Sequence, residues 1–362
     1  MKMPKEIICE EISKKGVLPF SRFMELALYC PESGYYETEM AKVGRGGDFI
    51  TSVSVGNLFG QLLAYQFSEW VGGGGWSPGT VIVEAGAHDG RLAADILGWL
   101  KAHRPECFAG LKYWILEPSL TREQWQRSTV KEFTENVGWA RDFKQLSAGG
   151  KNGKINGIVF SNELLDSFPV RRFGWDKMGT HWFEWGVTRE GDNFIWAKLE
   201  KANFKLTNPE LEAVLPDGYT VEIAPASAEW WRAAAGMLGQ GRLLAIDYGF
   251  TEEEIFLPSR QRGTLRAYSQ HHVSDDVLAN PGGQDLTAHV NFSAIQKAGE
   301  AGGLATEAFF SQAKFLTQIL AKTQVGGNFG EWTPARTRQF QTLTHPEHFG
   351  RAFRVLVQSR SV

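Results

Sequence analysis

A short turn between a strand pattern and a helix pattern holds the residues best suited to chemistry in this chain. The apolar β-formers Val81–Val83 lead into Glu84, and Gly86 and Gly90 follow before a helical pattern opens at Leu92. Such a unit presents backbone N–H groups to a nucleotide-like ligand. The acid would repel a pyrophosphate, so it favours a ligand with cationic or hydrogen-bond-donating groups, such as the amino-acid end of S-adenosylmethionine (SAM). The alternative is that the two glycines only allow the strand and the helix to pack closely.

Polar side chains also follow the other apolar runs that the sequence predicts as strands. They are Glu117, Asn162–Glu163 and Asp247–Tyr248. The carboxyl ends of parallel strands lie along one edge of a sheet, so we expect these groups and Glu84 to converge on one site. Glu117 is placed to accept the ribose hydroxyls of a nucleotide. Its alternative role is to cap the helix expected near Thr121.

The elements that would position these residues follow from hydrophobic periodicity. Short apolar runs alternate with helical patterns between residues 80 and 165, which predicts an α/β fold with a parallel sheet and crossover helices. Aromatic residues interleaved with glycines predict inserted antiparallel hairpins with a tryptophan-rich core. We therefore expect an N-terminal helical and lid segment at 1–75, a core at 76–170 and 224–362, and a hairpin subdomain at 171–223.

The N-terminal part combines helices with a glycine-rich loop. Residues 4–30 are predicted as two helices broken at Gly16–Pro19, the second with Ser21 as its N-cap. The loop carries Asp48 and Thr51, and its lack of apolar periodicity suits a lid that closes over the ligand. A plain solvated turn is the alternative for these two residues.

Composition narrows the class of protein. The net charge of -3 and the pI near 6.3 give no electrostatic case for binding nucleic acid or a membrane surface. No apolar run is long enough to span a bilayer, and no metal site is expected because His271–His272 lack further ligands at suitable spacing. The first residues lack the pattern of a secretory or organelle-targeting segment, so we expect a cytoplasmic protein, compatible with a homodimer.

Several segments, taken in order, resemble the MidA family, predicted SAM-dependent methyltransferases related to the mitochondrial complex I assembly factor that methylates a protein arginine. The matching segments are 23–29 with 34–36, 47–52, 84–90, 161–166 with 169–170, 247–249, 263–266 and 284–290. The resemblance covers nearly the whole chain and implies a class I methyltransferase fold, a Rossmann-like seven-stranded sheet whose last strand is antiparallel. It also implies SAM as cofactor and a protein substrate, arginine by analogy.

The chain departs from the family pattern at three places. His88 stands where the family usually has a third glycine, and it either tolerates the turn or crowds the cofactor. Val53–Gly56 replace the usual Pro-Glu-Ile-Ser, and Asn291 replaces a common Asp. The loss of carboxylates puts the substrate chemistry in more doubt than cofactor binding.

Under this resemblance, Glu163 and Asp166 are the best catalytic candidates. Methyl transfer is an in-line displacement, and a guanidinium acceptor needs carboxylates that orient it and accept its proton. Asn162 would lie beside the sulfonium, and His289 is a candidate proton acceptor. The alternatives are that Asp166 caps a turn, that Glu163 pairs with Arg171 or Arg172, and that His289 bonds to a backbone carbonyl.

Two other classes of protein compete with the methyltransferase. A nicotinamide-dependent oxidoreductase would carry a Gly-x-Gly-x-x-Gly loop, which is absent because His88 and Asp89 occupy the turn. A non-catalytic protein of the same fold, with a degraded donor loop, would act as a binding or assembly factor. His88 and the altered 53–56 segment are the features that favour this second alternative.

Overall fold

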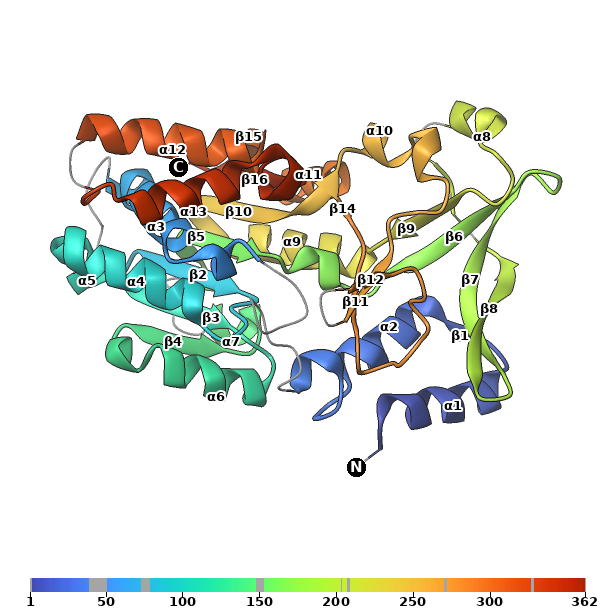
Figure 1. Cartoon of the computed structure of the whole chain (residues 1–362). Helices are drawn as coiled ribbons and strands as arrows, with labels where there is room; N and C mark the ends of the chain where they lie inside the picture. The colour runs from blue at the N-terminus through green and yellow to red at the C-terminus, as the bar shows by residue number, and fades with distance from the viewer. Residues whose placement is uncertain are drawn as a thin grey trace. The chain divides into compact units, whose positions relative to one another are not determined.

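The chain divides into two compact units. The computed structural model (Figure 1) describes residues 2–38, 51–72, 79–147, 153–202, 204–206, 209–269, 272–326 and 329–361. Unit 1 comprises Met1–Phe49, Asp166–Ala228 and Phe250–Ala294, and unit 2 comprises Ile50–Leu165, Glu229–Gly249 and Ile295–Val362. The three-part division at 1–75, 171–223 and the remaining core stays a prediction.

Unit 2 is built on a mostly parallel sheet. Its strands are β2 (Val81–Ala85), β3 (Lys112–Leu116), β4 (Val137–Ala140), β5 (Ile155–Asn162), β10 (Leu238–Phe250), β15 (Ala305–Ser311) and β16 (Phe353–Arg360). They lie in the order β15-β16-β10-β5-β2-β3-β4. The pairs from β4 to β10 are parallel, whereas β16 runs antiparallel to β10 and to β15. The predicted α/β class with an antiparallel last strand is confirmed.

One face of this sheet is covered by three long helices, α3 (Leu58–Gly72), α4 (Arg91–His103) and α12 (Gln312–Gly326). Leu62, Ile96 and Leu316 are fully buried in one cluster with side chains of the sheet. The apolar residues of α4 recur at helical spacing, so burial of this face holds the helix against β2. The other helices of unit 2 are α5 (Pro105–Gly110), α6 (Leu120–Thr129), α7 (Phe143–Ser147), most of α9 (Pro225–Met237), most of α11 (Phe292–Ala301) and α13 (Pro334–Thr344).

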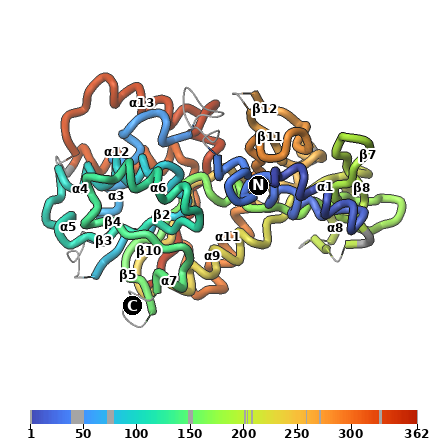
Figure 2. The backbone as a smooth tube through the Cα atoms, turned by 90° about the horizontal axis from the view of Figure 1, so that it is seen from below, coloured from blue at the N-terminus to red at the C-terminus, as the bar shows by residue number. Residues whose placement is uncertain are grey.

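Unit 1 has an antiparallel sheet in the order β1-β7-β6-β9, with β8 paired to β7. Its strands are β1 (Leu18–Pro19), β6 (Arg171–Asp176), β7 (His181–Glu190), β8 (Asn193–Lys201) and β9 (Thr220–Ile223). Figure 2 shows β7 and β8 side by side, as expected for a hairpin. Trp175 and Trp182 are buried together, so the predicted hairpins and their tryptophan-rich core are confirmed.

The N-terminal helices of unit 1 are α1 (Pro4–Lys15) and α2 (Phe20–Tyr29). The predicted break at Gly16–Pro19 is confirmed, but α2 begins at Phe20 with Pro19 as its N-cap, so Ser21 lies inside the helix. A small antiparallel sheet joins β11 (Arg266–Ser269) to β12 (His272–Ser274) and β13 (Asp285–Thr287). The remaining short elements are α8 (Glu210–Val214), α10 (Glu252–Ile255) and β14 (Val290–Asn291). Across the described ranges, no helix has the length and apolar character to cross a membrane.

Candidate active site

The parallel strands of unit 2 end in register. Ala85 at the end of β2 pairs with Leu116 of β3 and with Ser161 of β5, while Asn162 pairs with Ile246 of β10. The polar residues of these strand ends therefore lie along one edge of the sheet, as predicted. In the order of the strands, they are Glu117, Glu84, Asn162–Glu163 and Asp247.

The turn after β2 has three residues in the left-handed region of the backbone map. Gly86 has φ 75°, His88 φ 47° and Gly90 φ 86°. A Cβ atom at Gly86 would lie 3.0 Å from Leu164 Cδ1, and one at Gly90 would lie 3.2 Å from Gln126 Cα, so both glycines also serve close packing. His88 adopts the left-handed turn without being glycine, which is one of the two outcomes expected for it.

Glu84 is buried beneath this turn. Tyr113 donates a hydrogen bond from its hydroxyl to Glu84 Oε2 at 2.6 Å. Burial raises the pKa of Glu84 to about 8, against the opposing effect of the Tyr113 hydrogen bond, and Asp89 and Asp95 add to the rise. A cationic group placed beside Glu84 would favour its ionised form. This environment therefore suits a ligand group that is positively charged.

Glu117, the acid after β3, is held by the start of α6. Its Oε1 accepts a hydrogen bond from Ser119 N at 2.9 Å and lies 3.1 Å from Arg122 Nη2. Its Oε2 accepts from Gln126 Nε2 at 2.9 Å. The N-cap of α6 is Ser119, whose Oγ accepts a hydrogen bond from Arg122 N at 3.2 Å, so Glu117 is not the capping residue. The ribose contact of Glu117 stays a prediction.

Gln126 is a site residue that sequence reasoning missed. Nothing marks it as special in a polar helical stretch, yet it is completely buried. Its amide bonds to Glu117 and also donates to the carbonyl oxygen of His88 at 3.0 Å. The available signal was its place on the helix that directly follows Glu117, one to two turns along.

Glu163 follows β5 in a strained conformation. Its φ is 52°, and its side chain Oε1 accepts hydrogen bonds from Ser52 N at 3.2 Å and from Asn162 Nδ2 at 3.0 Å. Asn162 Oδ1 is buried and accepts no hydrogen bond within the described part of the chain. A buried acceptor of this kind suits a donor group on a ligand. In unit 1, Arg171 forms an ion pair with Glu184, and Arg172 forms one with Glu222.

Asp247 fixes the backbone that follows Glu163. Its Oδ2 accepts hydrogen bonds from Leu164 N at 3.1 Å and Leu165 N at 2.8 Å, and its Oδ1 accepts from Tyr248 N at 2.8 Å. Burial raises its pKa to about 7, and the charge of Glu163 adds to the rise, while the backbone N–H groups oppose it. The strand end was predicted, but this role as an acceptor for three backbone donors was not.

The segment that precedes the α3 helix contributes one of the predicted cofactor residues. Thr51 Oγ1 accepts from Ser54 N at 3.1 Å and Thr51 N donates to Ser54 Oγ at 3.0 Å, which closes a turn at the 3₁₀ helix Val53–Val55. Thr51 is buried rather than solvated. Asp48 lies outside the described residues.

The other two predicted catalytic residues belong to unit 1. Asp166 lies in the 3₁₀ helix Leu165–Ser167, and its backbone carbonyl accepts a hydrogen bond from Ala288 N, next to His289, at 3.0 Å. The His289 ring stacks on Phe250 with ring centroids 4.7 Å apart. Burial lowers the pKa of His289 to about 4, so its imidazole is neutral at neutral pH.

A group of tyrosines in unit 1 surrounds further buried acids. Tyr36 donates from its hydroxyl to Asp285 Oδ1 at 2.8 Å, Tyr29 donates to Ser167 Oγ at 2.8 Å, and the two rings stack at 5.5 Å. Burial raises the pKa of Tyr36 well above its usual value, and the charges of Asp285 and, more weakly, Asp166 add to the rise. Two buried carboxylates therefore act on one aromatic cluster, which makes its surroundings favourable to a cation.

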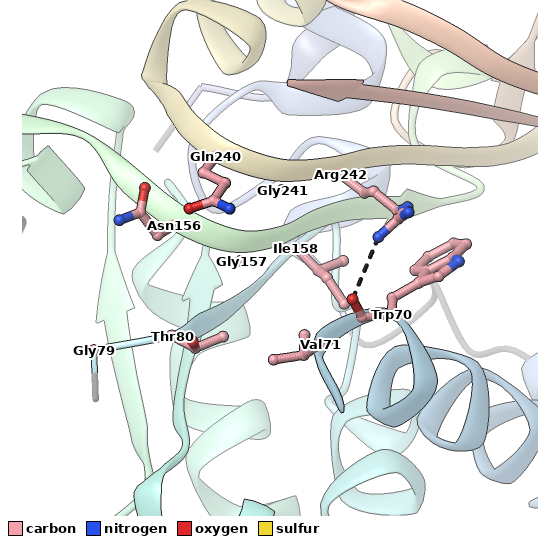
Figure 3. Close-up of a pocket in the computed structure, with 10 residues that line it drawn as sticks. All are labelled: Trp70, Val71, Gly79, Thr80, Asn156, Gly157, Ile158, Gln240, Gly241 and Arg242. Atoms are coloured by element: carbon pink, nitrogen blue, oxygen red, sulfur yellow. Dashed lines mark hydrogen bonds between the residues drawn. The ribbon is translucent and has the colours of Figure 1, made fainter. Parts of the chain in front are cut away.

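A cavity at the opposite edge of the unit 2 sheet is not part of this arrangement. It is lined by residues at the beginnings of strands, including Thr80, Gly157 and Gly241 (Figure 3). Arg242 also lines it and donates from Nη1 to the backbone carbonyl of Trp70 at 3.4 Å (Figure 3). In parallel α/β sheets, ligands bind at the carboxyl ends of the strands. This cavity lies at the amino ends, so we do not assign it to ligand binding.

A parallel sheet with an antiparallel last strand, a glycine-bearing turn after β2 and polar strand ends define a nucleotide-binding α/β protein of the class I methyltransferase type. A family described as "putative S-adenosyl-L-methionine-dependent methyltransferase" matches residues 62–310. The chain belongs to this family, and its cofactor is SAM. A crystal structure of a COG1565 superfamily member from Burkholderia thailandensis, bound to S-adenosyl-homocysteine, is 30% identical with a TM-score of 0.81, covering 99% of this chain and 92% of that one.

Curated relatives carry more specific names. The Drosophila melanogaster protein arginine methyltransferase NDUFAF7 homolog, mitochondrial, is 25% identical and covers 96% of this chain and 82% of its own length. The Mus musculus protein arginine methyltransferase NDUFAF7, mitochondrial, is 28% identical, with 85% and 72% covered. These mitochondrial names contradict the expected cytoplasmic location. That expectation was wrong because it rested on the lack of a targeting pattern in the first residues.

Proposed function

We propose that this methyltransferase transfers the methyl group of SAM to an arginine side chain of a protein. The names of the curated relatives support the acceptor. The observation that carries the proposal is the register of β3, β2, β5 and β10, because it aligns Glu117, Glu84, Asn162 and Asp247 along one edge. Among the described residues, no contact favours a catalytically degraded assembly factor, and His88 accommodates its turn.

In this proposal, the carboxyl edge of unit 2 holds the donor. The backbone of the turn from Gly86 through His88 to Gly90 would approach the cofactor, and Glu117 would contact its ribose. Glu84 and the buried Asn162 Oδ1 would receive the ammonium of the amino-acid end. SAM, when bound, supplies an electrophilic methyl group on a sulfonium. Asp48 and Thr51 remain lid candidates, with Thr51 acting through its turn.

Glu163 is the proposed catalytic carboxylate. Arginine is protonated in water, so a nitrogen that attacks the methyl group must lose a proton as the new N–C bond forms. A carboxylate accepts that proton and orients the guanidinium at the same time. The contacts from Ser52 N and Asn162 Nδ2 hold Glu163 Oε1 and support this role because they limit the rotation of its side chain.

Within unit 1, a second group of side chains is proposed to be able to bind a guanidinium. The stacked rings of Tyr29 and Tyr36 and the carboxylates of Asp166 and Asp285 offer the aromatic faces and negative charge that a guanidinium prefers. His289 is proposed as a proton acceptor, and its neutral state at physiological pH supports this role. Its low pKa makes it a weak base, which suits transient proton transfer rather than storage of a proton.

Calorimetry with SAM, S-adenosyl-homocysteine and NAD tests the donor half. We expect the protein to bind SAM and S-adenosyl-homocysteine but not NAD. Binding of NAD would indicate an oxidoreductase. Binding of none of the three would indicate a degraded binding protein. The acceptor half is tested by affinity capture of bound proteins, incubation with SAM and mass spectrometry of methylated residues. Methyl groups on lysine or a terminus, with none on arginine, would refute the proposed acceptor and leave the donor site intact.

A further inference from the structure

One buried amide joins the two loops that the donor must contact. Gln126, on α6, has no exposed surface. Its Nε2 donates to the His88 carbonyl oxygen at 3.0 Å and to Glu117 Oε2 at 2.9 Å. Its Oε1 accepts from Trp139 Nε1 at 3.0 Å. Both the donor and the acceptor side of the amide are therefore engaged.

The two acceptors come from neighbouring strands. His88 lies in the turn after β2 and Glu117 follows β3, and these strands pair in parallel. Adjacent strands lie about 4.8 Å apart, and their following loops have no ladder to hold them. A single –NH₂ group has two N–H bonds at a fixed angle, so it sets the distance between the two oxygens it contacts. Trp139, on β4, holds the far side of the same amide.

The backbone around Gln126 is packed as tightly as its side chain. A Cβ atom at Gly90 would lie 3.2 Å from Gln126 Cα and 3.5 Å from Gln126 O. Gly90 is also the N-cap of α4. The turn after β2 therefore rests against the backbone of α6 at the residue whose side chain holds His88 and Glu117.

We infer that Gln126 is a positioning residue for cofactor binding, which sets the Glu117 carboxylate relative to the turn after β2. The inference rests on the donor site proposed above. Recognition of ribose hydroxyls depends on a carboxylate held in one orientation. Without the amide donor, Glu117 keeps its contacts with Ser119 and Arg122 but loses its link to the His88 carbonyl.

The test is the binding of S-adenosyl-homocysteine, adenosine and 2′-deoxyadenosine to the full chain by calorimetry. Gln126→Met preserves the unbranched shape and removes every hydrogen bond of the amide. We expect a loss of S-adenosyl-homocysteine affinity of about 10-fold or more, because the Glu117 carboxylate loses its hydrogen bond to the amide. The preference for adenosine over 2′-deoxyadenosine should also shrink towards one.

Trp139→Phe is the matched control. It removes the hydrogen bond to Gln126 Oε1 but leaves both donors of the amide in place, so the nucleoside preference should stay as in the wild type. A purely structural Gln126 would predict equal losses for both nucleosides in Gln126→Met, with an unchanged preference. That result, or wild-type affinity in Gln126→Met, would overturn the inference. Failure of the wild type to bind S-adenosyl-homocysteine would instead overturn the donor site itself.

Gln126→Glu keeps the test decisive if Gln126→Met does not fold. The introduced carboxyl faces the Glu117 carboxylate, and two adjacent acids raise the pKa of one of them. Protonation as the pH falls restores a donor to Glu117, so the affinity for S-adenosyl-homocysteine relative to the wild type should rise as the pH is lowered, whereas Trp139→Phe should follow the wild type. Affinity that does not respond to pH would contradict the positioning role.

Discussion

The two edges of the unit 2 sheet differ in which residue types adopt a positive φ. At the amino edge, Gly157 and Gly241 have φ 143° and 128°, and a Cβ atom there would lie 2.0 Å and 1.8 Å from backbone carbonyl oxygens. At the carboxyl edge, the left-handed positions include His88 and Glu163, which have side chains. Among the described residues of unit 2, these are the non-glycine positions with positive φ.

The contrast indicates which edge is shaped by folding and which by function. Glycine takes a positive φ at little cost, whereas another residue pays about 1–3 kcal/mol and persists only if its surroundings enforce it. Glu163 is enforced by Asp247, which grips the next two backbone N–H groups, and by the contact of its own N with Ile246 O. Retained strain at a polar edge motivates a catalytic role for Glu163.

The largest effect is expected for Glu163→Gln, which tests whether the carboxyl edge is catalytic. The amide keeps the size of the side chain but cannot accept a proton, so methyl transfer should fall by about 10²–10⁴-fold. Affinity for S-adenosyl-homocysteine should stay within a few-fold, measured by calorimetry beside a methyl-transfer assay. Glu132→Gln, an exposed acid of the same unit, is the control and should keep full activity. Retained turnover in Glu163→Gln would dismiss Glu163 as an essential group.

The amino edge should respond in stability rather than in chemistry. Gly241→Ala forces a Cβ atom onto the carbonyl oxygen of Gly157, so we expect a loss of about 3 kcal/mol or more in the free energy of unfolding. Gly98→Ala on α4 has open space, with its nearest neighbour 4.0 Å away, and should stabilise the helix by up to about 1 kcal/mol. Urea unfolding measures both. Equal changes in the free energy of unfolding for the two variants would contradict the steric explanation for glycine at the amino edge.

The pH dependence of the free energy of unfolding tests whether Glu84, at the carboxyl edge, is protonated in the folded protein. Burial raises the pKa of Glu84 to about 8, so the folded state holds a proton that the unfolded chain has already lost at neutral pH. Stability therefore falls as pH rises from the ordinary pKa of glutamate to about 8 and then levels off. Between pH 7 and 8 the fall is about 1 kcal/mol.

Glu84→Gln is the reference for that titration, because its amide cannot lose a proton. The difference in unfolding free energy between the two proteins should change over this pH range. A constant difference from pH 6 to 9 would show that Glu84 is ionised throughout.

The smallest expected effect is that of His88→Gly. Glycine removes the strain of φ 47°, while it also increases the entropy of the unfolded chain, so the net change in stability should stay within about 1 kcal/mol. If the His88 side chain crowds the cofactor, affinity for S-adenosyl-homocysteine should rise a few-fold in calorimetry. Unchanged affinity would refute the crowding and leave His88 as a tolerated residue of the turn.

The sequence predicted the elements whose periodicity is strong and failed where the signal is local or absent. The strands β2, β3, β5 and β10 carry apolar runs, whereas β4 (Val137–Ala140) is short and includes a glycine, so it was missed. Strand ends predicted the edge that carries Glu84 and Glu117, because parallel strands share their direction.

Contacts made by backbone groups could not be predicted from the sequence. The three N–H donors held by Asp247 and the carbonyl held by Gln126 carry no residue-specific mark. Gln126 is buried because of the way α6 is oriented about its own axis. An amphipathic pattern does not show which polar residue of a helix is buried in this way. The predicted roles of Asp166 and His289 stay open, since these residues lie in the other unit.

The hydrogen bond from Trp139 Nε1 to Gln126 has a spectroscopic consequence. An indole N–H gives an isolated proton resonance in NMR, and this one ends on the amide that also touches the turn after β2 and the acid after β3. Occupation of the nucleotide edge would shift that resonance before any turnover occurs. The protein therefore carries an internal reporter for ligand arrival, which can be assigned by its loss in Trp139→Phe.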